Sequence, residues 1–283
     1  MSNPYLSGSE LCAATSRRLL LVAAFFLLPY ATTHAQEHEE GDHDHDHDHL
    51  HFSHPMVTES PSPDTKLRLD FLAARTSGSL GLHENTFRLE GEYAFNHSVS
   101  LAIVTPFISR TAPATERASG LGNIELSLKA ASLAFGERGL LLGGGLSVAL
   151  PTGSDAKGIG SGHVVELEPF LDAGYKRDEF ELVGFALLSS TFRRQAGDEA
   201  ERNLTFDFSA LYRLQSRLEG LIELTTARAL VGAESGSQQT FIAPGFKVYP
   251  FTNRKLMFGA SVELGTGAVR DTRGLLVSGF YHF

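Results

Sequence analysis

The sequence predicts an all-β protein, a transmembrane antiparallel β-barrel of about 12 strands preceded by a disordered N-terminal tail. Three observations predict it: apolar and polar residues alternate along many long segments, short and long connections between these segments alternate, and the last strand ends on phenylalanine. We expect residues 1–35 to be a signal peptide, residues 36–65 a disordered, histidine- and aspartate-rich periplasmic tail, and residues 66–283 the barrel.

The first 35 residues have the three parts of a signal peptide. Arg17 and Arg18 supply positive charge, an apolar run follows over 19–28, and small residues up to Ala35 form a cleavage site. The apolar run is about half of the ~20 residues that a membrane-spanning helix needs. The one cysteine, Cys12, precedes this run, so we expect the mature chain to form neither disulfides nor thiolate metal sites.

Aspartate and histidine alternate in the predicted tail. This polar composition cannot bury an apolar core, so we expect disorder. Imidazole nitrogens beside carboxylate oxygens suit Zn(II), Ni(II), Co(II) or Cu(II), while a solvated acidic spacer or a pH-sensitive tail fits the same composition. The predicted metal ligands are His38, Asp42, His43, Asp44, His45, Asp46, His47, Asp48, His49, His51 and His54.

From residue 66 onward, period-2 alternation predicts strands with one apolar and one polar face. Phe87, Leu89 and Tyr93, for example, alternate with Arg88 and Glu90. Most segments have ten to fourteen residues, enough for a tilted bilayer crossing and longer than an ordinary strand of ~5–6 residues. The twelve segments are 66–76, 84–95, 98–109, 122–135, 139–150, 163–175, 179–192, 203–214, 217–230, 239–249, 256–266 and 274–283.

The connections favour a membrane barrel over a soluble β-sandwich, whose strands also alternate but are shorter. Short turns and longer polar loops follow one another regularly, as in outer-membrane barrels, which places both chain ends in the periplasm and implies an even strand number. The last strand, ending at Phe283, resembles the C-terminal signal that the barrel assembly machinery reads. We therefore expect the chain to lie in the outer-membrane lipid of a Gram-negative bacterium.

The polar face of the strands would line the lumen. Carboxylates outnumber bases there, so a water-filled lumen would favour cations, but the same charges could pair and fill a narrow barrel. The one apolar lumen patch that the sequence offers consists of Val183, Phe185 and Leu187. The predicted lumen-facing residues are Glu90, Glu92, Glu125, Lys129, Glu166, Glu168, Asp172, Asp207 and Glu223.

Two function classes are not expected. The chain has a formal charge of -9 and no basic stripe, which disfavours nucleic acid as a partner. No G-x-S-x-G nucleophile motif is present, and Ser161 close to His163 does not by itself define a hydrolase. We predict no enzymatic activity, no catalytic residue and no required cofactor.

Two short motifs resemble a known family. Gly120-Leu121-Gly122-Asn123, followed within the strand by Lys129, is similar to one family motif, and Pro151-Thr152-Gly153 before a glycine-rich loop is similar to another. Together they resemble the MetA-pathway of phenol degradation family over about residues 67–283. The resemblance implies an outer-membrane barrel that passes small, often hydrophobic compounds. Asn123 stands where the family has aspartate, and the Asp/His tail is not part of its pattern.

These observations lead to a hypothesis of a passive outer-membrane channel or transporter for small solutes, with a tail that collects divalent metal ions in the periplasm. Two alternatives stay open. One is a non-conducting barrel whose tail buffers metal or binds a partner, and the other is a conduit for hydrophobic or aromatic compounds. The sequence does not choose the cargo.

Overall fold

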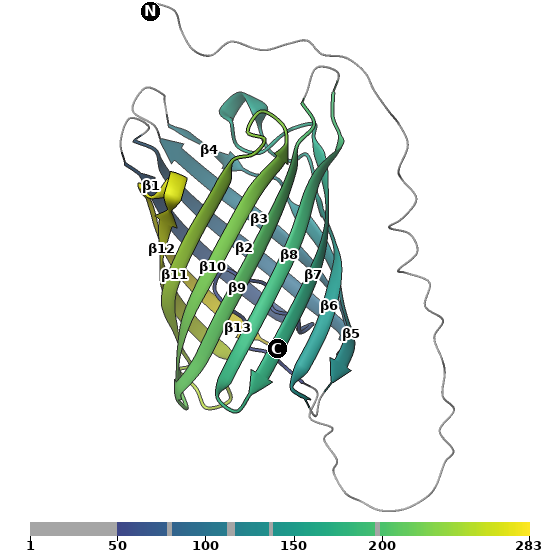
Figure 1. Ribbon diagram of the computed structural model, residues 1–283, viewed down its shortest axis with the longest axis vertical. Helices are drawn as coiled ribbons and strands as arrows, with labels where there is room; N and C mark the ends of the chain where they lie inside the picture. The colour runs from purple at the N-terminus through teal and green to yellow at the C-terminus, as the bar shows by residue number, and fades with distance from the viewer. Residues whose placement is uncertain (1–49, 78–80, 112–116, 136–137, 196–198) are drawn as a thin grey trace, which may run out of the picture. The chain divides into compact units, whose positions relative to one another are not determined.

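A closed ring of twelve antiparallel strands forms the barrel (Figure 1). The computed structural model describes residues 50–77, 81–111, 117–135, 138–195 and 199–283, so the predicted signal peptide lies outside the described residues. Each strand pairs with its neighbour along the chain, and β1 pairs with β13 to close the ring. The strands of the ring are β1 (Lys66–Thr76), β2 (His83–Asn96), β3 (Val99–Thr111), β5 (Glu125–Phe135), β6 (Leu140–Ala149), β7 (Val165–Arg177), β8 (Phe180–Arg193), β9 (Arg202–Gln215), β10 (Leu218–Val231), β11 (Gln238–Val248), β12 (Leu256–Thr266) and β13 (Thr272–His282).

The prediction of an all-β barrel with about 12 strands is confirmed. Two of the predicted segments, 66–76 and 256–266, have the observed bounds, and the other ten differ by no more than three residues at either end. The short strand β4 (Ala118–Leu121) was not predicted; it pairs only with β3, at the loop end of that strand. Among the described residues, no helix is long and apolar enough to cross a membrane.

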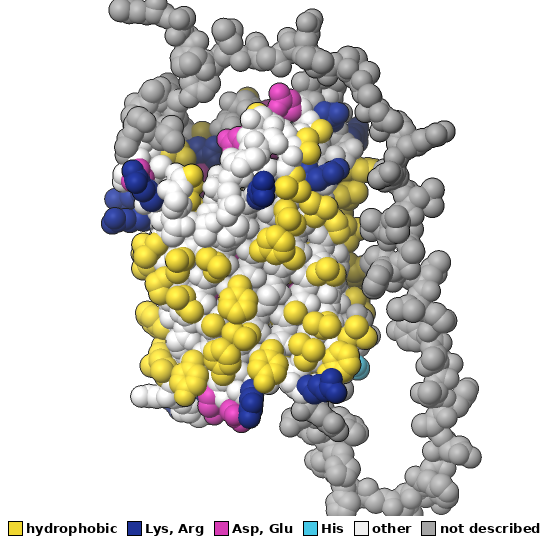
Figure 2. Space-filling model, viewed as in Figure 1, with side chains coloured by type: hydrophobic (Ala, Val, Ile, Leu, Met, Phe, Trp, Pro, Cys, Tyr) yellow, Lys and Arg dark blue, Asp and Glu magenta, His cyan; other side chains and the backbone are white. Residues whose placement is uncertain are grey.

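The strands turn their apolar side chains outward. In β1, Leu67, Leu69 and Phe71 are exposed, whereas Lys66 and Arg68 are buried inside the ring. Figure 2 shows apolar side chains spread over the outer wall, with charged side chains confined to its two ends. This distribution is the reverse of that in a water-soluble barrel and suits a wall surrounded by lipid, where each backbone polar group must be bonded within the ring.

The two ends of the barrel differ in their connections. Tight turns join β2 to β3, β7 to β8 and β9 to β10, and Asp178 adopts a left-handed φ of 53° in one of them. The first residue of β1 and the last residue of β13 also lie at this end, which we call the short-turn end. The opposite end, the loop end, carries the longer connections, including β4 and the 3-10 helices η2 (Asp155–Lys157) and η3 (Gly267–Val269).

Residues 50–65, which we call the luminal segment, lie inside the ring. Phe52 and Met56 are fully buried and pack with inward residues from strands all around the barrel, including Leu141, Val183 and Leu276. The expectation that residues 36–65 form a disordered tail is therefore corrected for 50–65, because this stretch finds its core and its hydrogen-bond partners in the barrel wall. The barrel itself begins at the predicted residue 66.

Candidate functional site

Glu223 on β10 holds the middle of the luminal segment. Its carboxylate accepts hydrogen bonds from the backbone N–H groups of Met56, Val57 and Thr58 at 3.0 to 3.2 Å. The hydroxyl of Ser209 on β9 donates to the same carboxylate at 2.7 Å and also contacts the Thr58 hydroxyl. Three consecutive amides around one carboxylate form an anion-binding turn, here with the anion supplied by the wall.

Two wall lysines hold Glu59 of the luminal segment. Lys129 Nζ lies 2.7 Å from Glu59 Oε1 and donates to the Ser60 carbonyl at 2.9 Å. Lys66 Nζ lies 3.4 Å from the same oxygen of Glu59. Burial raises the pKa of Glu59, but the charges of Lys129 and Lys66 outweigh it and hold that pKa well below its ordinary value. Glu59 therefore stays ionised and paired at neutral pH.

Two further wall cations bind backbone carbonyls of the segment. Arg68 on β1 donates to the Met56 carbonyl, and Lys247 on β11 donates to the His54 carbonyl at 3.1 Å. Both cations also have a carboxylate partner in the wall, Asp70 for Arg68 and Glu219 for Lys247. A buried charge is tolerated when it has an ion-pair partner and its remaining hydrogen bonds are made, and both cations meet these conditions.

Phe52 and Ser53 make two further contacts with the wall. A Cβ atom placed on Gly174 of β7 would lie 2.6 Å from the Phe52 ring, so only glycine leaves room for the ring at this point. The backbone N–H of Ser53 donates to Glu181 on β8 at 2.8 Å. The segment is thus bonded to β1, β5, β8, β10 and β11, which lie on different sides of the ring.

A cavity of about 180 Å³ lies on the loop side of the luminal segment. Its floor includes Val57 and Glu59, and its wall carries more carboxylates than bases. One side of the wall is apolar: the rings of Phe170 and Phe185 lie 5.2 Å apart beside Leu187. The acidic residues that line it are Glu59, Glu90, Glu92, Glu125, Glu168 and Asp207, and the basic ones are Arg88 and Lys129.

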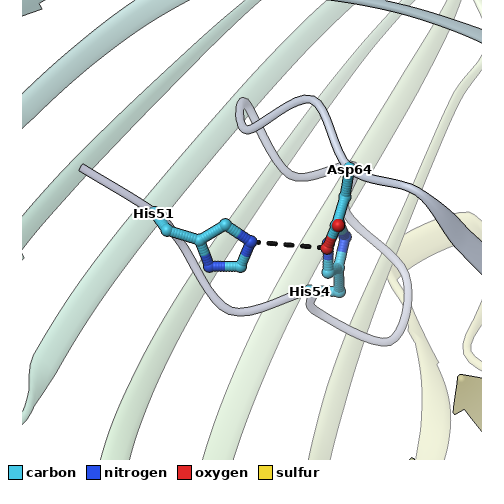
Figure 3. A group of neighbouring side chains, drawn as sticks. All are labelled: His51, His54 and Asp64. Carbon is cyan, nitrogen blue, oxygen red and sulfur yellow. Dashed lines mark hydrogen bonds and ion pairs between the residues drawn. The ribbon is translucent and has the colours of Figure 1, made fainter. Parts of the chain in front are cut away.

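A cluster of histidines closes the other side of the segment, at the short-turn end. Nε2 of His51 and Nε2 of His54 lie 3.3 and 3.2 Å from one oxygen of Asp64, and Nδ1 of His282 lies 2.6 Å from that same oxygen. Figure 3 shows His51 directed toward Asp64, with His54 beside the carboxylate. His282 comes from β13, whose register places it opposite Lys66 at the start of β1.

The environment sets the protonation of this cluster. Burial, followed by the charge of Lys66, lowers the pKa of His54 well below its ordinary value, so His54 is neutral at pH 7. Burial raises the pKa of Asp64, but hydrogen bonds from His282, His51 and His54 outweigh it and lower that pKa. Asp64 is therefore a carboxylate, and neutral imidazole with carboxylate is the protonation state that binds divalent metal ions.

The structure places the predicted residues in three groups. Of the predicted metal ligands, only His51 and His54 lie within the described residues, and they share one cluster. Most of the predicted lumen-facing residues line the loop-side cavity or hold the luminal segment: Glu90, Glu92, Glu125, Lys129, Glu168, Asp207 and Glu223. The remaining two, Glu166 and Asp172, lie on β7, where Glu166 accepts a hydrogen bond from Ser189 at 2.7 Å and Asp172 is buried.

Four important residues were missed by the sequence reasoning. Phe52, Met56 and Glu59 lie in the stretch that we predict to be a disordered tail, and Asp64 is not among the predicted metal ligands. For Asp64 a signal existed, because it precedes the first strand and the inward position of His282 follows from the alternation with Tyr281 and Phe283. For the other three, the partners lie on distant strands and leave no local pattern.

Comparison with known proteins shows the fold. No family model matches the chain, and no curated protein matches it. The COG4313 outer membrane channel from Pseudomonas putida F1 aligns with a TM-score of 0.60 at 13% identity, over 78% of this chain and 96% of that one. The NanC porin aligns at 0.53 and 12%, over 76% and 100%, and the translocator domain of autotransporter NalP from Neisseria meningitidis at 0.51 and 12%, over 77% and 88%. The barrel thus has the fold of outer-membrane proteins, while the resemblance to the MetA-pathway of phenol degradation family stays a prediction.

Proposed function

We propose that the protein is an outer-membrane channel for small solutes that its own luminal segment closes. The observation that carries this proposal is the presence of residues 50–65 inside a ring with a polar inner wall, bonded to strands on different sides of that ring. An inner wall that was only structural could pair its charges with one another. Here Lys129, Lys247 and Glu223 bond to groups of the segment as well as to the wall, so departure of the segment would leave a polar, hydrated passage.

The lengths of the connections support one orientation of the barrel in the membrane. Outer-membrane barrels have short turns on the periplasmic side and longer loops outside, so the short-turn end would face the periplasm. The luminal segment would then enter from the periplasm, and the cavity of about 180 Å³ would open toward the outside. Lipid surrounds the apolar outer wall in this arrangement, and the barrel assembly machinery would insert the chain.

The charge of the cavity favours cations as cargo. Glu125, Glu168 and Asp207 lie around its wall, while Arg88 is ion-paired to Glu90 and Lys129 to Glu59. Unpaired carboxylates in a confined, partly apolar space attract positive solutes and repel anions.

A cysteine pair tests the closure. Ser209 Oγ and Thr58 Oγ1 are in hydrogen-bond contact, so cysteines at these two positions can form a disulfide between wall and segment. In planar bilayers, Thr58→Cys with Ser209→Cys should show little conductance when oxidised and an increased open probability when reduced. The control pair is Ser127→Cys with Ser147→Cys, whose hydroxyls lie 2.7 Å apart within the wall and whose oxidation should change nothing. If the first pair conducts equally well when oxidised and when reduced, the closure is refuted. If it conducts in neither state, the protein is a non-conducting barrel.

A second cargo class is favoured by one observation. Phe170, Phe185 and Leu187 form an apolar strip on one side of the same acidic cavity. Such a strip fits aromatic or otherwise hydrophobic solutes, as the resemblance in sequence also implies. If it contributes, benzylammonium should block the reduced channel more strongly than methylammonium, and Phe185→Ser should remove that difference while K⁺ conductance persists.

A further inference from the structure

Three imidazoles from two distant parts of the chain converge on one carboxylate. His51, His54 and Asp64 belong to the luminal segment, and His282 belongs to the last strand. The side chain of His51 is 55% exposed, whereas that of His54 is only 3% exposed. The cluster borders a cavity of about 350 Å³ at the short-turn end. A group that enters this cavity can therefore reach Nε2 of His51 and Asp64 without unfolding the segment.

The geometry points to a metal site: we propose that His51 Nε2, His54 Nε2 and the Asp64 carboxylate bind one divalent transition-metal ion such as Zn(II). Two bonds of ~2.05 Å at the tetrahedral angle place their ligand atoms ~3.3 Å apart. The distances from Asp64 to the two Nε2 atoms are 3.3 and 3.2 Å, so two edges of the tetrahedron are already formed. The ligand atoms of the three residues lie within 4.8 Å of one another, so the third edge would need a shift of no more than ~1.5 Å, and all three ligand residues border the cavity.

His282 would act as a positioning residue for Asp64. Its Nδ1 lies 2.6 Å from the carboxylate oxygen that also faces the two ligand histidines. The other oxygen of Asp64 accepts a hydrogen bond from the Thr65 N–H at 2.8 Å. A ligating carboxylate that is hydrogen-bonded in this way keeps its orientation, and loss of such a partner typically weakens metal binding by ~10- to 100-fold.

Three of the positive charges around the cluster have a carboxylate partner. Lys176, Arg213 and Arg254 line the same cavity, and each has a glutamate partner: Glu181 at 3.0 Å for Lys176, Glu179 at 3.1 Å for Arg213, and Glu219 for Arg254. Repulsion of an incoming cation by these bases is therefore reduced.

Lys66 links the metal site to the contacts that hold the segment. Its Nζ donates to Nδ1 of His54 at 3.1 Å, which leaves the proton of this neutral ring on Nε2, directed at Asp64. An ion at Nε2 moves that proton to Nδ1, so the ammonium of Lys66 must turn away from His54. The carboxylates of Glu59, Glu90 and Glu92 are available to it at 3.4, 3.2 and 2.8 Å.

The site would join the closing segment to β13, next to the Asp/His run in the sequence. Binding of an ion would stabilise the closed state, and this consequence alone rests on the proposed function. The existence of the site does not depend on it, because metal binding is measured without conductance.

A metal titration tests the site. The full mature chain is prepared in a background in which the histidines before the luminal segment are replaced by asparagine, namely His38, His43, His45, His47 and His49. Titration with Zn(II), and with Co(II) followed by its visible absorption, should show one ion per chain. Asp64→Asn and His51→Asn should each weaken binding at least tenfold, and because His51 is exposed its replacement leaves the fold intact. Asp155→Asn is the matched control, since Asp155 faces a single histidine, His163, at the loop end.

The outcomes separate the alternatives. No single-site binding in this background, or equal binding in Asp64→Asn and His51→Asn, would overturn the metal site whatever the conductance shows. His282→Asn keeps a donor close to the place of Nδ1 and should bind nearly as tightly as the parent, whereas His282→Phe should bind ~10- to 100-fold more weakly. Loss of binding in both variants would instead make His282 a ligand and would refute its positioning role.

Discussion

Glu223 on β10 accepts hydrogen bonds from the backbone N–H of Val57 with both of its carboxylate oxygens, at 3.0 and 3.1 Å. Glu223 is buried in the wall, and the peptide to which it binds belongs to a segment that precedes the first strand. A buried carboxylate with such partners is stable only while the segment is in place. The wall and the luminal segment therefore depend on each other.

We predict that Glu223→Gln opens the channel. The amide group keeps one acceptor and replaces the other with a donor that faces backbone N–H groups. Hydrogen bonds to charged groups contribute ~1.5–3 kcal/mol, so the open population should rise by ~10- to 100-fold. Single-channel recording of the full mature chain measures this. Glu263→Gln, at a glutamate of β12 that is paired in register with Gly274, should leave the open probability unchanged.

We predict that Gly174→Ala displaces Phe52. The added Cβ would lie 2.6 Å from a fully buried aromatic ring, which cannot move aside as a flexible side chain can. Overpacking of this kind costs ~1–3 kcal/mol. Because backbone hydrogen bonds between strands hold the wall in place, this cost should destabilise the bound luminal segment and not the wall. Hydrogen exchange of peptides covering residues 50–60 should accelerate. Gly184→Ala on β8, where nothing lies within 4 Å of the new Cβ, should leave exchange unchanged.

The fold of the wall could be predicted because its cause is local. Along each strand, apolar and polar residues alternate, as Leu67, Arg68 and Leu69 do, and this alternation predicts the two faces of the wall. The alternation of short and long connections predicts which strand ends lie together. The luminal segment has no such repeat. Phe52 and Met56 are its only fully buried large hydrophobic residues, and most of the rest of the stretch is polar residues and proline, so its composition resembles that of a solvated tail.

The candidate site was predictable in part for the same reason. The residue type and density of His51 and His54 predict metal ligands, which stays a prediction, and the lumen-facing acids could be predicted from alternation. Asp64 and His282 are 218 residues apart, and they meet because β1 pairs with β13. That pairing closes the ring and cannot be read from any short window of sequence.

The closure should resist mild acid and fail in strong acid. The pKa of Glu59 is lowered in the folded state, so its ion pairs with Lys129 and Lys66 stabilise the bound segment fully above the unfolded pKa near 4.5. This stabilisation is lost as the pH falls through the still lower folded pKa. Conductance of the wild-type chain should thus stay low from pH 7 to 5 and rise well below pH 4.5. Glu59→Gln lacks these ion pairs at every pH. It should already conduct at pH 7, and its conductance should rise less than that of the wild type when the pH is lowered.

Cation preference should depend on the acids of the loop-side cavity. Glu125, Glu168 and Asp207 line this space, and their charges act across a narrow, partly apolar volume where screening is weak. In the Glu223→Gln background, Glu125→Gln with Glu168→Gln and Asp207→Asn should shift the reversal potential in a KCl gradient toward zero.

The matched control removes the same charge from the outside of the loops. Glu201→Gln, Glu234→Gln and Asp271→Asn change the net charge equally, but all three side chains are exposed, where solvent and salt screen them. Their reversal potential should stay near that of the Glu223→Gln parent. If the cavity variant and the control behave alike, selectivity arises from the overall charge of the barrel or at another constriction, and the cavity acids only fill space.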